Sequence, residues 1–322
     1  MQIGIFSDCH LGENLFRKII DGRNAWSYLA ELSMRQAINA LCDKGVDCII
    51  IAGDLFDLPN PDIGSLLAAK AAFEAVNVPI FLLGGNHEWS QRQKLANIHP
   101  FDLLQNVNTA YDSPKQFQIG DKKIMMLPYK SLTPEGFEFV RLNKSDILVA
   151  HGILGGQEQI YCIPEQLVTN YELVILGHVH TSSLVKAGKT TILTPGSTMP
   201  PNTFQTTPSA WIYNTDTHFT ESIPLDTPTM HEVFIEKDKI NDFLEQILEN
   251  PKSYDMYSIH YSGPASDIDE LTYKRCCGHT LNIRLSTNEN LNANNGQKVE
   301  DFWVTVQDLH PEWVDEFKSI LH

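Results

Sequence analysis

The chain has 322 residues, 42% of them hydrophobic and 20% charged, which suits one large soluble domain plus a smaller one. Its formal net charge of -16 argues against a nonspecific basic DNA clamp. No apolar run approaches the roughly 20 residues of a membrane helix, no signal peptide is expected, and the six cysteines form no CxxC pair, so we expect a cytoplasmic protein with reduced thiols and no membrane partner.

The first two hundred residues alternate apolar runs with helical patterns. Residues 2–7 predict a strand, and residues 26–45 predict a helix that ends near a glycine. Residues 47–54 predict a second strand, and residues 63–76 a second, amphipathic helix. Further apolar runs lie at residues 79–85, 123–129, 146–152, 172–178 and 190–196. Continuous apolar runs are typical of strands buried on both faces, so we expect helices to cover the sheets.

A change of composition near residues 224–230 marks a boundary between two α/β regions. After it the pattern restarts with a strand, a helix, a strand, a helix and a strand, at residues 231–236, 240–250, 257–263, 267–274 and 280–286. We therefore expect three parts: residues 1–225, a small α/β unit at residues 226–295, and a C-terminal segment at residues 296–322.

The C-terminal segment follows an Asn-rich stretch and is predicted to form a helix. Pro311 suits its first turn. Its predicted apolar face consists of Trp313, Val314, Phe317, Ile320 and Leu321. This face either packs on the second unit of the chain itself or binds a partner protein.

Polar side chains follow five of the predicted strands, in the motifs "SDCHLG", "GDLFD", "GNHE", "AHG" and "GHVH". Loops beyond the carboxyl ends of strands build the sites of α/β proteins. Asp8 and His10 are two residues apart, as are His178 and His180, and we expect each pair to face the same way along an extended segment. Imidazole and carboxylate together suit Mn, Fe or Zn.

One such pair alone is more often a surface pair than a site. Five motifs in order, each at the end of an apolar strand, are much less easily explained by coincidence. The remaining histidines outside these motifs have no such context, and we interpret them as structural or solvated: His99, His218, His231, His260, His279, His310 and His322.

The order D-x-H, GD, GNH-[ED], HG and GHxH resembles the calcineurin-like metallophosphoesterase superfamily. Within it, "DCHLG", "GDLFD", "GNHE" and "TPGS" resemble the SbcD-type nuclease subunit of the DNA double-strand-break repair complex, over residues 1 to about 200. The resemblance implies a four-layer αββα sandwich, with the later α/β unit as a capping domain. Cys9, Thr194 and the acidic balance depart from the pattern of that family.

The resemblance also implies seven metal ligands: Asp8, His10, Asp54, Asn86, His151, His178 and His180. Asp8, His10 and His180 would hold one divalent ion, and Asp54 would bridge to a second ion held by the other three, with manganese as the expected metal. His87 would be the catalytic group, protonating the leaving oxygen or stabilising the transition state.

Three neighbouring side chains are expected outside the ligand set. We expect Glu88 and Asp57 to orient other groups rather than bind metal. Cys9 should pack away from the site, because strand alternation turns it from its neighbours.

The function that follows is a metal-dependent DNA nuclease, exonuclease on duplex ends and endonuclease on single strands. The expected partners are DNA, an SbcC-type coiled-coil ATPase and a second copy of the chain. The printed sequence contains no P-loop motif, so ATP hydrolysis would come from the partner.

Two alternatives are a phosphatase or phosphodiesterase for small molecules or phosphoproteins, and a noncatalytic DNA-end scaffold. The full ligand set argues against the scaffold. Residues 226–322 carry 18 Asp and Glu against 8 Lys and Arg, which argues against strong DNA binding by this chain alone.

Overall fold

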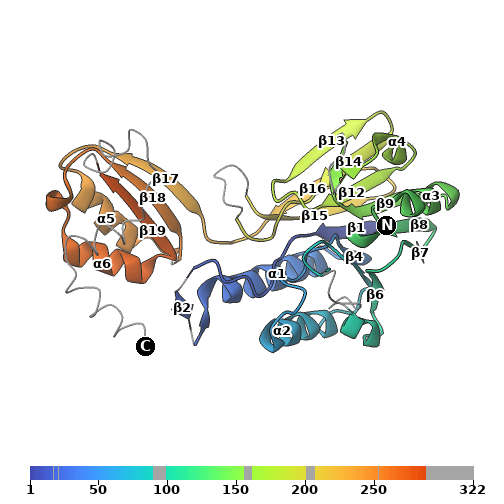
Figure 1. The fold of residues 1–322 in the computed structure, drawn as a ribbon, viewed down its shortest axis with the longest axis horizontal. Helices are drawn as coiled ribbons and strands as arrows, with labels where there is room; N and C mark the ends of the chain where they lie inside the picture. Colours follow the sequence, from blue (N-terminus) through green and yellow to red (C-terminus); the bar gives the residue numbers. More distant parts are fainter. Residues whose placement is uncertain are drawn as a thin grey trace. The chain divides into compact units, whose positions relative to one another are not determined.

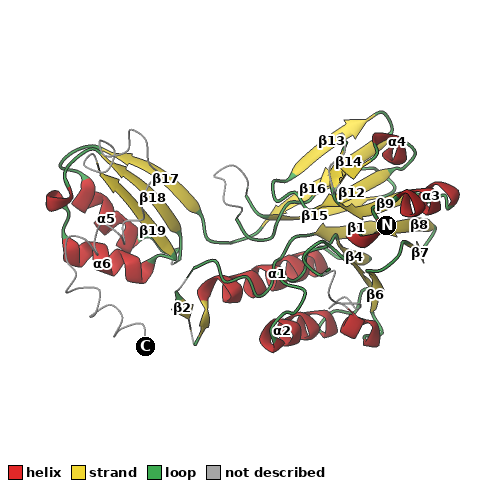
Figure 2. Cartoon of the chain, in the orientation of Figure 1, coloured by secondary structure: helices red, strands yellow, loops and turns green. Residues whose placement is uncertain are grey.

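The structure is a computed structural model, and it describes residues 1–16, 18–20, 22–89, 99–155, 162–200, 207–252 and 254–287. The chain divides into two compact units, Met1–Thr227 and Pro228–His322. Figure 1 follows the elements along the chain, and Figure 2 separates helices from strands. The expected C-terminal helix at residues 296–322 and the last part of the expected cap, residues 288–295, lie outside the described residues.

The first sheet of unit 1 is mixed. Its strands, in spatial order, are β16 (Thr220–Pro224), β15 (Ser209–Asn214), β1 (Gln2–Phe6), β4 (Cys48–Ile51), β5 (Ile80–Leu83) and β6 (Val107–Ala110). The four strands from β1 to β6 are parallel, whereas β15 and β16 are antiparallel to their neighbours. Every residue of β4 and β5 is buried, which confirms that these apolar runs are strands covered on both faces.

The second sheet of unit 1 is also mixed. Its strands, in spatial order, are β13 (Ser183–Ala187), β14 (Thr190–Thr194), β12 (Leu173–Gly177), β9 (Ile147–His151), β8 (Lys122–Leu127) and β7 (Lys115–Ile119). The central four are parallel, and the two edge strands are antiparallel. The parallel strands of both sheets therefore bring several carboxyl ends together, where α/β proteins build their sites.

The two sheets pack face to face through one buried apolar cluster. It contains Ile5 and Ile50 from the first sheet and Met126 and Val149 from the second. Helices lie on the outer faces (Figure 1): α1 (Ala25–Asp43) and α2 (Ile63–Glu74) beside the first sheet, and α3 (Pro134–Leu142) and α4 (Glu165–Val168) beside the second. A second apolar cluster joins α3 and α4 to β8, β9 and β12.

The boundaries of the first helix follow its capping residues. The Asn24 side chain accepts hydrogen bonds from two amides of the first turn, and Gly45 takes the left-handed conformation (φ 71°) just beyond the end. The predicted helix at residues 26–45 is thus confirmed within two residues.

The second helix differs from the amphipathic helix that the sequence predicts. Ile63 and Leu67 are 77% and 59% exposed, while Ala69 and Phe73 on the opposite face are buried. Apolar side chains therefore lie on both faces of α2, so the expected separation of an apolar and a polar face is wrong.

Unit 1 also contains two short strand pairs, β2 (Ile19–Ile20) with β3 (Arg23–Asn24), and β10 (Ile153–Leu154) with β11 (Cys162–Ile163). All six cysteines are free thiols, as expected. Among the described residues, no helix combines the length and the apolar character needed to cross a membrane.

Unit 2 is built on a parallel sheet with the order β17 (Met230–Ile235), β18 (Met256–Tyr261) and β19 (Asn282–Thr287). The connections are α5 (Ile240–Glu249) and α6 (Glu270–His279), which contact each other. Leu244 and Cys276 of these helices pack against Ile259 and Leu285 of the sheet. The predicted alternation of three strands and two helices is confirmed.

A buried carboxylate ties the first strand of unit 2 to the end of α5. Asp255 is 2% exposed. It accepts hydrogen bonds from the Thr229 amide (2.8 Å), His231 Nε2 (2.9 Å) and Asn250 Nδ2 (3.0 Å). Burial acts to raise the pKa of Asp255, but these bonds outweigh it and hold the pKa below its usual value.

Replacing Asp255 with alanine should destabilise unit 2, because three partly buried donors lose their buried acceptor. We expect a loss of about 3 kcal/mol, measured by urea unfolding and by hydrogen exchange of the β18 amides. The pKa of Asp255 is lower in the folded chain than its ordinary value of 3.8. The difference in stability between wild type and Asp255→Ala should therefore be fully present above pH 3.8, and it should shrink as the pH falls through the folded pKa. Glu249→Ala, an exposed change on α5, is the control. Equal stability of wild type and Asp255→Ala at pH 7 would contradict this role.

Candidate metal centre

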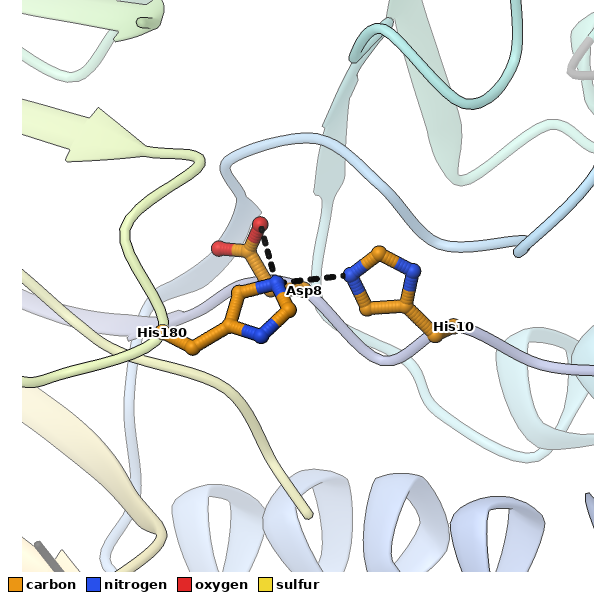
Figure 3. A group of neighbouring side chains, drawn as sticks. All are labelled: Asp8, His10 and His180. Atoms are coloured by element: carbon orange, nitrogen blue, oxygen red, sulfur yellow. Dashed lines mark hydrogen bonds and ion pairs between the residues drawn. The ribbon is translucent and has the colours of Figure 1, made fainter. Parts of the chain in front are cut away.

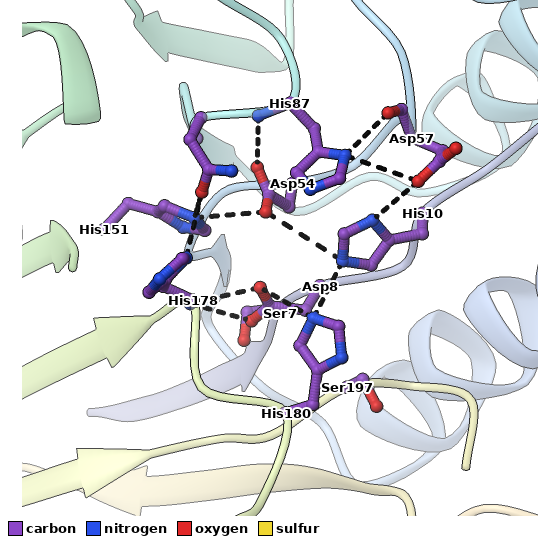
Figure 4. Close-up of polar contacts among 12 residues, drawn as sticks. Ser7, Asp8, His10, Asp54, Asp57, His87, His151, His178, His180 and Ser197 are labelled. Atoms are coloured by element: carbon purple, nitrogen blue, oxygen red, sulfur yellow. Dashed lines mark hydrogen bonds and ion pairs between the residues drawn. The ribbon is translucent and has the colours of Figure 1, made fainter. Parts of the chain in front are cut away.

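The loops at the carboxyl ends of both sheets of unit 1 meet at one place (Figure 4). The first sheet supplies residues that follow β1, β4 and β5, and the second sheet supplies residues that end or follow β9 and β12. The structure brings together all eight predicted site residues: Asp8, His10, Asp54, Asn86, His87, His151, His178 and His180.

One group of ligand atoms comes from Asp8, His10 and His180 (Figure 3). One ligand atom from each lies within 4.8 Å of the others. His10 Nε2 is 3.0 Å from His180 Nε2, and His180 Nε2 is 4.0 Å from Asp8 Oδ1. Two imidazole nitrogens and a carboxylate thus face one another at a spacing that could surround a single ion.

A second group consists of Asp54, His151 and His178, whose ligand atoms also lie within 4.8 Å of one another. Asn86 Oδ1 joins it, 3.0 Å from His151 Nε2 and 2.9 Å from His178 Nδ1. Asp54 Oδ2 lies 3.2 Å from His151 Nε2 and 3.9 Å from His10 Nε2, so this oxygen lies between the two groups.

A third trio, His10, Asp54 and His87, overlaps both groups. His87 Nδ1, however, donates to the backbone carbonyl oxygen of Asp57 (2.6 Å) and lies 3.3 Å from Asp57 Oδ1. One nitrogen of His87 is therefore already engaged, and its side chain is 37% exposed at the edge of the cluster.

Hydrogen bonds orient two of the imidazoles so that Nε2 faces the cluster. His151 Nδ1 donates to the Ala52 carbonyl (2.8 Å), and His10 Nδ1 donates to Asp57 Oδ1 (3.3 Å). Such partners fix the tautomer of a metal-binding histidine. Asp57 thus contacts both His10 and His87, in keeping with its expected orienting role. Ala52 was not anticipated, because a backbone acceptor leaves no signal in the sequence.

The backbone of the site is left-handed at four predicted ligands: Asp8 (φ 54°), His10 (φ 48°), Asp54 (φ 49°) and His178 (φ 93°). The expectation that Asp8 and His10 converge through strand alternation is therefore wrong, since β1 ends at Phe6. Turns direct them instead, and backbone bonds hold the turns: Asp8 N to Gly53 O (3.0 Å) and His10 N to Asp54 O (3.1 Å). Left-handed backbone costs about 1–2 kcal/mol per residue and tends to occur at functional sites.

The glycine beside Asp54 is required by close packing. Gly53 has a φ of 99°, and a Cβ placed there would lie 2.2 Å from His151 Nδ1. Any other residue would push His151 away from its position in the second group.

Burial and mutual charge shift the pKa values of the side chains in the site. Burial and the Asp54 charge raise the pKa of Asp8 to about 6, against the lowering effect of His151. Burial acts to lower the pKa of His151, but the Asp54 carboxylate raises it to about 10. Burial and then the His10 charge lower the pKa of His180 to about 4. These shifts in opposite directions arise because several ionisable side chains are buried close together.

The donor set fits divalent metal ions. It consists of imidazole nitrogens, carboxylate oxygens and one amide oxygen, which suit borderline divalent ions. Asp54 Oδ2 lies between the two groups, as a bridging ligand would. The arrangement is consistent with a two-metal site.

Residues 1–218 match the family model described as the calcineurin-like phosphoesterase superfamily domain. The chain belongs to this superfamily. Its fold is the α/β metallophosphoesterase fold with two mixed sheets and additional small sheets, and its chemistry is metal-dependent hydrolysis of phosphoesters. The matched region ends within unit 1, which contains every residue of the site.

Three curated relatives are similar to a little over half of the chain. One is the uncharacterized metallophosphoesterase YhaO of Bacillus subtilis (strain 168), 27% identical, covering 59% of this chain and 48% of the relative. Another is the DNA double-strand break repair protein Mre11 of Methanosarcina mazei, 26% identical, covering 60% of this chain and 32% of the relative. The third is a subunit of the nuclease SbcCD of Staphylococcus saprophyticus, 22% identical, covering 56% of each. The chain spans about a third to a little over half the length of these relatives.

Proposed function

We propose that the chain is a metal-dependent DNA nuclease that acts as an exonuclease on duplex ends and as an endonuclease on single strands. The observation that carries the phosphoesterase chemistry is the convergence of six ligand side chains around a seventh, Asp54. The choice of DNA is supported by similarity to relatives named as Mre11 and as a subunit of the nuclease SbcCD.

The proposed ligand assignment follows the two groups in Figure 4. Asp8, His10 and His180 hold one ion, and Asn86, His151 and His178 hold the other. Asp54 would serve both ions, because its Oδ2 lies between the two groups of ligand side chains. We propose Mn²⁺ as the metal, and two such ions supply an activated water and neutralise charge on the phosphodiester.

The proposed role of His87 is to protonate the leaving oxygen. Its Nδ1 is held by the Asp57 carbonyl, which leaves Nε2 for the substrate. The hydrogen bond with Asp57 raises the pKa of His87 to about 9. An imidazolium at the edge of the site can give a proton to a departing alkoxide.

A second candidate function is a phosphatase or phosphodiesterase for small molecules or phosphoproteins. The acidic surface favours it, because phosphate contacts dominate DNA affinity. Of the basic residues in unit 2, Lys274 pairs with Glu270 (2.6 Å) and Arg275 lies 3.7 Å from Glu245. Their charges are therefore largely offset by their neighbours.

Unit 2 is proposed as a cap that positions DNA. Its three-stranded α/β fold forms a separate unit whose acidic character would keep DNA affinity modest. The positive surface must then come from elsewhere in the assembly.

The proposed partners are a second copy of the chain and an SbcC-type coiled-coil ATPase. Ile63 and Leu67 are exposed one turn apart on α2, and Leu58 is exposed just before it. A contiguous exposed apolar patch marks a protein interaction site, and we propose that these three side chains contribute to one. Similarity to a subunit of the nuclease SbcCD supports the ATPase. The segment proposed to bind it, residues 296–322, lies outside the described residues.

The function is tested with the purified full chain, in Mn²⁺ or in EDTA. The substrates are linear duplex DNA, a single-stranded DNA circle and bis-p-nitrophenyl phosphate. We expect Mn²⁺-dependent cleavage of all three. Hydrolysis of the small diester without DNA cleavage would favour the second candidate function.

Ending the chain after Thr227 tests the cap. We expect the truncated chain to hydrolyse the small diester normally, since unit 1 holds the site. Duplex cleavage should fall at least about tenfold, which corresponds to a loss of about 1.4 kcal/mol in binding. Circular dichroism checks that unit 1 remains folded. Equal duplex cleavage by both chains would remove the reason for calling unit 2 a cap.

A further inference from the structure

Glu88 is a buried carboxylate beside the metal centre that binds none of the proposed ligand side chains. It is 1% exposed. Its Oε2 accepts hydrogen bonds from the amides of Gly85 (2.8 Å) and Asp54 (3.2 Å), and its Oε1 accepts from the amide of Phe56 (2.8 Å). Both oxygens are thus occupied by backbone donors.

These three donors belong to two different loops. Gly85 lies in the loop after β5, whereas Asp54 and Phe56 lie in the loop after β4. The loops touch directly, because a Cβ on Gly85 would come within 2.1 Å of Asp54 Oδ1 and 2.5 Å of Asp54 N. Glu88 therefore joins two loops that glycine alone allows to come so close.

Glu88 binds a backbone segment that contains a residue in an unfavourable conformation. Asp54 has a φ of 49°, which an L-residue adopts at a cost. The Glu88 bond fixes its amide, and the His10 amide bonds its carbonyl (3.1 Å). The amide of His87, which lies in the same loop as Glu88, also donates to Asp54 Oδ1 (2.9 Å). The other carboxylate oxygen, Oδ2, therefore lies between the two ligand groups.

We infer that Glu88 is a positioning residue that sets the placement of Asp54 and Asn86 relative to each other, and through them the spacing of the two ions. The inference rests on the proposed two-metal site. Three amides around one carboxylate make a rigid junction, because each donor is buried and would be costly to leave unpaired. Asp54 serves both ions and Asn86 serves one, so a shift between the loops changes the distance between the ions.

The test compares Glu88→Gln with wild type. Glutamine keeps the shape of the side chain but replaces one acceptor oxygen with an NH₂ donor, so at least one amide faces another donor. We expect the affinity for the second Mn²⁺ to fall about 10- to 100-fold, the usual effect of losing an orienting partner. Metal titration measures this, and electron paramagnetic resonance should show loss of the signal of the coupled Mn²⁺ pair.

Glu31→Gln is the matched control. Glu31 is also a buried glutamate of unit 1, but it pairs with Arg23, away from the metal centre. The Glu31→Gln variant should change thermal stability while leaving both Mn²⁺ affinities and the signal of the coupled Mn²⁺ pair unchanged. Glu88→Asp keeps the carboxylate and should retain more of the coupled signal than Glu88→Gln. If Glu88→Gln fails to fold, the weakened second site should be seen in Glu88→Asp.

The outcomes separate this inference from the proposed function. A wild-type chain that binds fewer than two Mn²⁺ ions would overturn the two-metal site itself. A wild-type chain with a coupled pair, together with a Glu88→Gln or a folded Glu88→Asp chain that keeps both affinities and the same signal, would overturn only the role of Glu88.

Discussion

Replacing Asp54 with alanine is expected to abolish hydrolysis of every phosphodiester substrate. Asp54 Oδ2 lies 3.2 Å from His151 Nε2 and 3.9 Å from His10 Nε2, so its loss removes a ligand from both proposed ions. Turnover should fall about a thousandfold or more, because metal stabilisation of charge contributes several kcal/mol. Bound Mn²⁺ should fall from two ions to one or none, measured by elemental analysis after gel filtration.

Asp47→Ala is the matched control for Asp54. Asp47 precedes β4, the strand that Asp54 follows, and its carboxylate accepts from the Gln2 amide (2.7 Å) at the opposite end of the sheet. This variant should keep two ions and normal turnover. An Asp54→Ala chain that binds two ions and cleaves normally would show that the site assignment is wrong.

Replacing His87 with alanine is expected to remove turnover while leaving both ions in place. The loss should be about 100-fold or more on DNA if His87 acts as a general acid. With bis-p-nitrophenyl phosphate the loss should be much smaller, since p-nitrophenolate leaves without needing a proton. The two rates and the metal content are measured on the same preparation.

Asp57→Asn is the companion variant for His87. The Asp57 side chain contacts both His10 and His87, and asparagine keeps an oxygen that can accept from either imidazole. Asp57→Asn should therefore lower DNA cleavage less than His87→Ala, which removes the imidazole itself. Loss of metal in parallel with activity in His87→Ala would instead make His87 a ligand, as the trio with His10 and Asp54 permits. Equal loss on both substrates would argue for transition-state stabilisation rather than proton transfer.

The sequence predicted the elements that are buried most completely. Strands β4, β5, β9 and β12 are uninterrupted apolar runs, and each is buried along its whole length. Their carboxyl ends carry the polar motifs, so the same apolar runs that predict the strands also predict that these side chains lie close together, as they do. The alternation in unit 2 was predicted from the repeat of strand and helix patterns, although β17 contains no buried residue and β19 only two.

Two of the missed strands lack such a pattern altogether, although β15, which is mostly buried, was missed as well. Strand β13 is exposed throughout, and β7 alternates without a buried residue, so no apolar run marks either of them. The orientation of Asp8 and His10 was attributed to strand alternation, whereas left-handed backbone just beyond β1 directs both side chains. Conformations of that kind depend on contacts with other loops, such as the bond from the Asp8 amide to the Gly53 carbonyl.

The metal centre draws its ligands from both sheets, and this has a consequence for how long the folded protein lasts. The His178 amide bonds both carboxylate oxygens of Asp8, although 170 positions separate them in the chain. Contacts over such separations form only after a large loop-closure entropy has been met. An ion bound by residues of both sheets would mainly oppose the separation of the two sheets during unfolding. Because these contacts form late in folding, bound metal is expected to slow unfolding more than it speeds folding. In a cell short of metal, the chain would open more often and be degraded sooner, so metal supply would set its abundance as well as its activity.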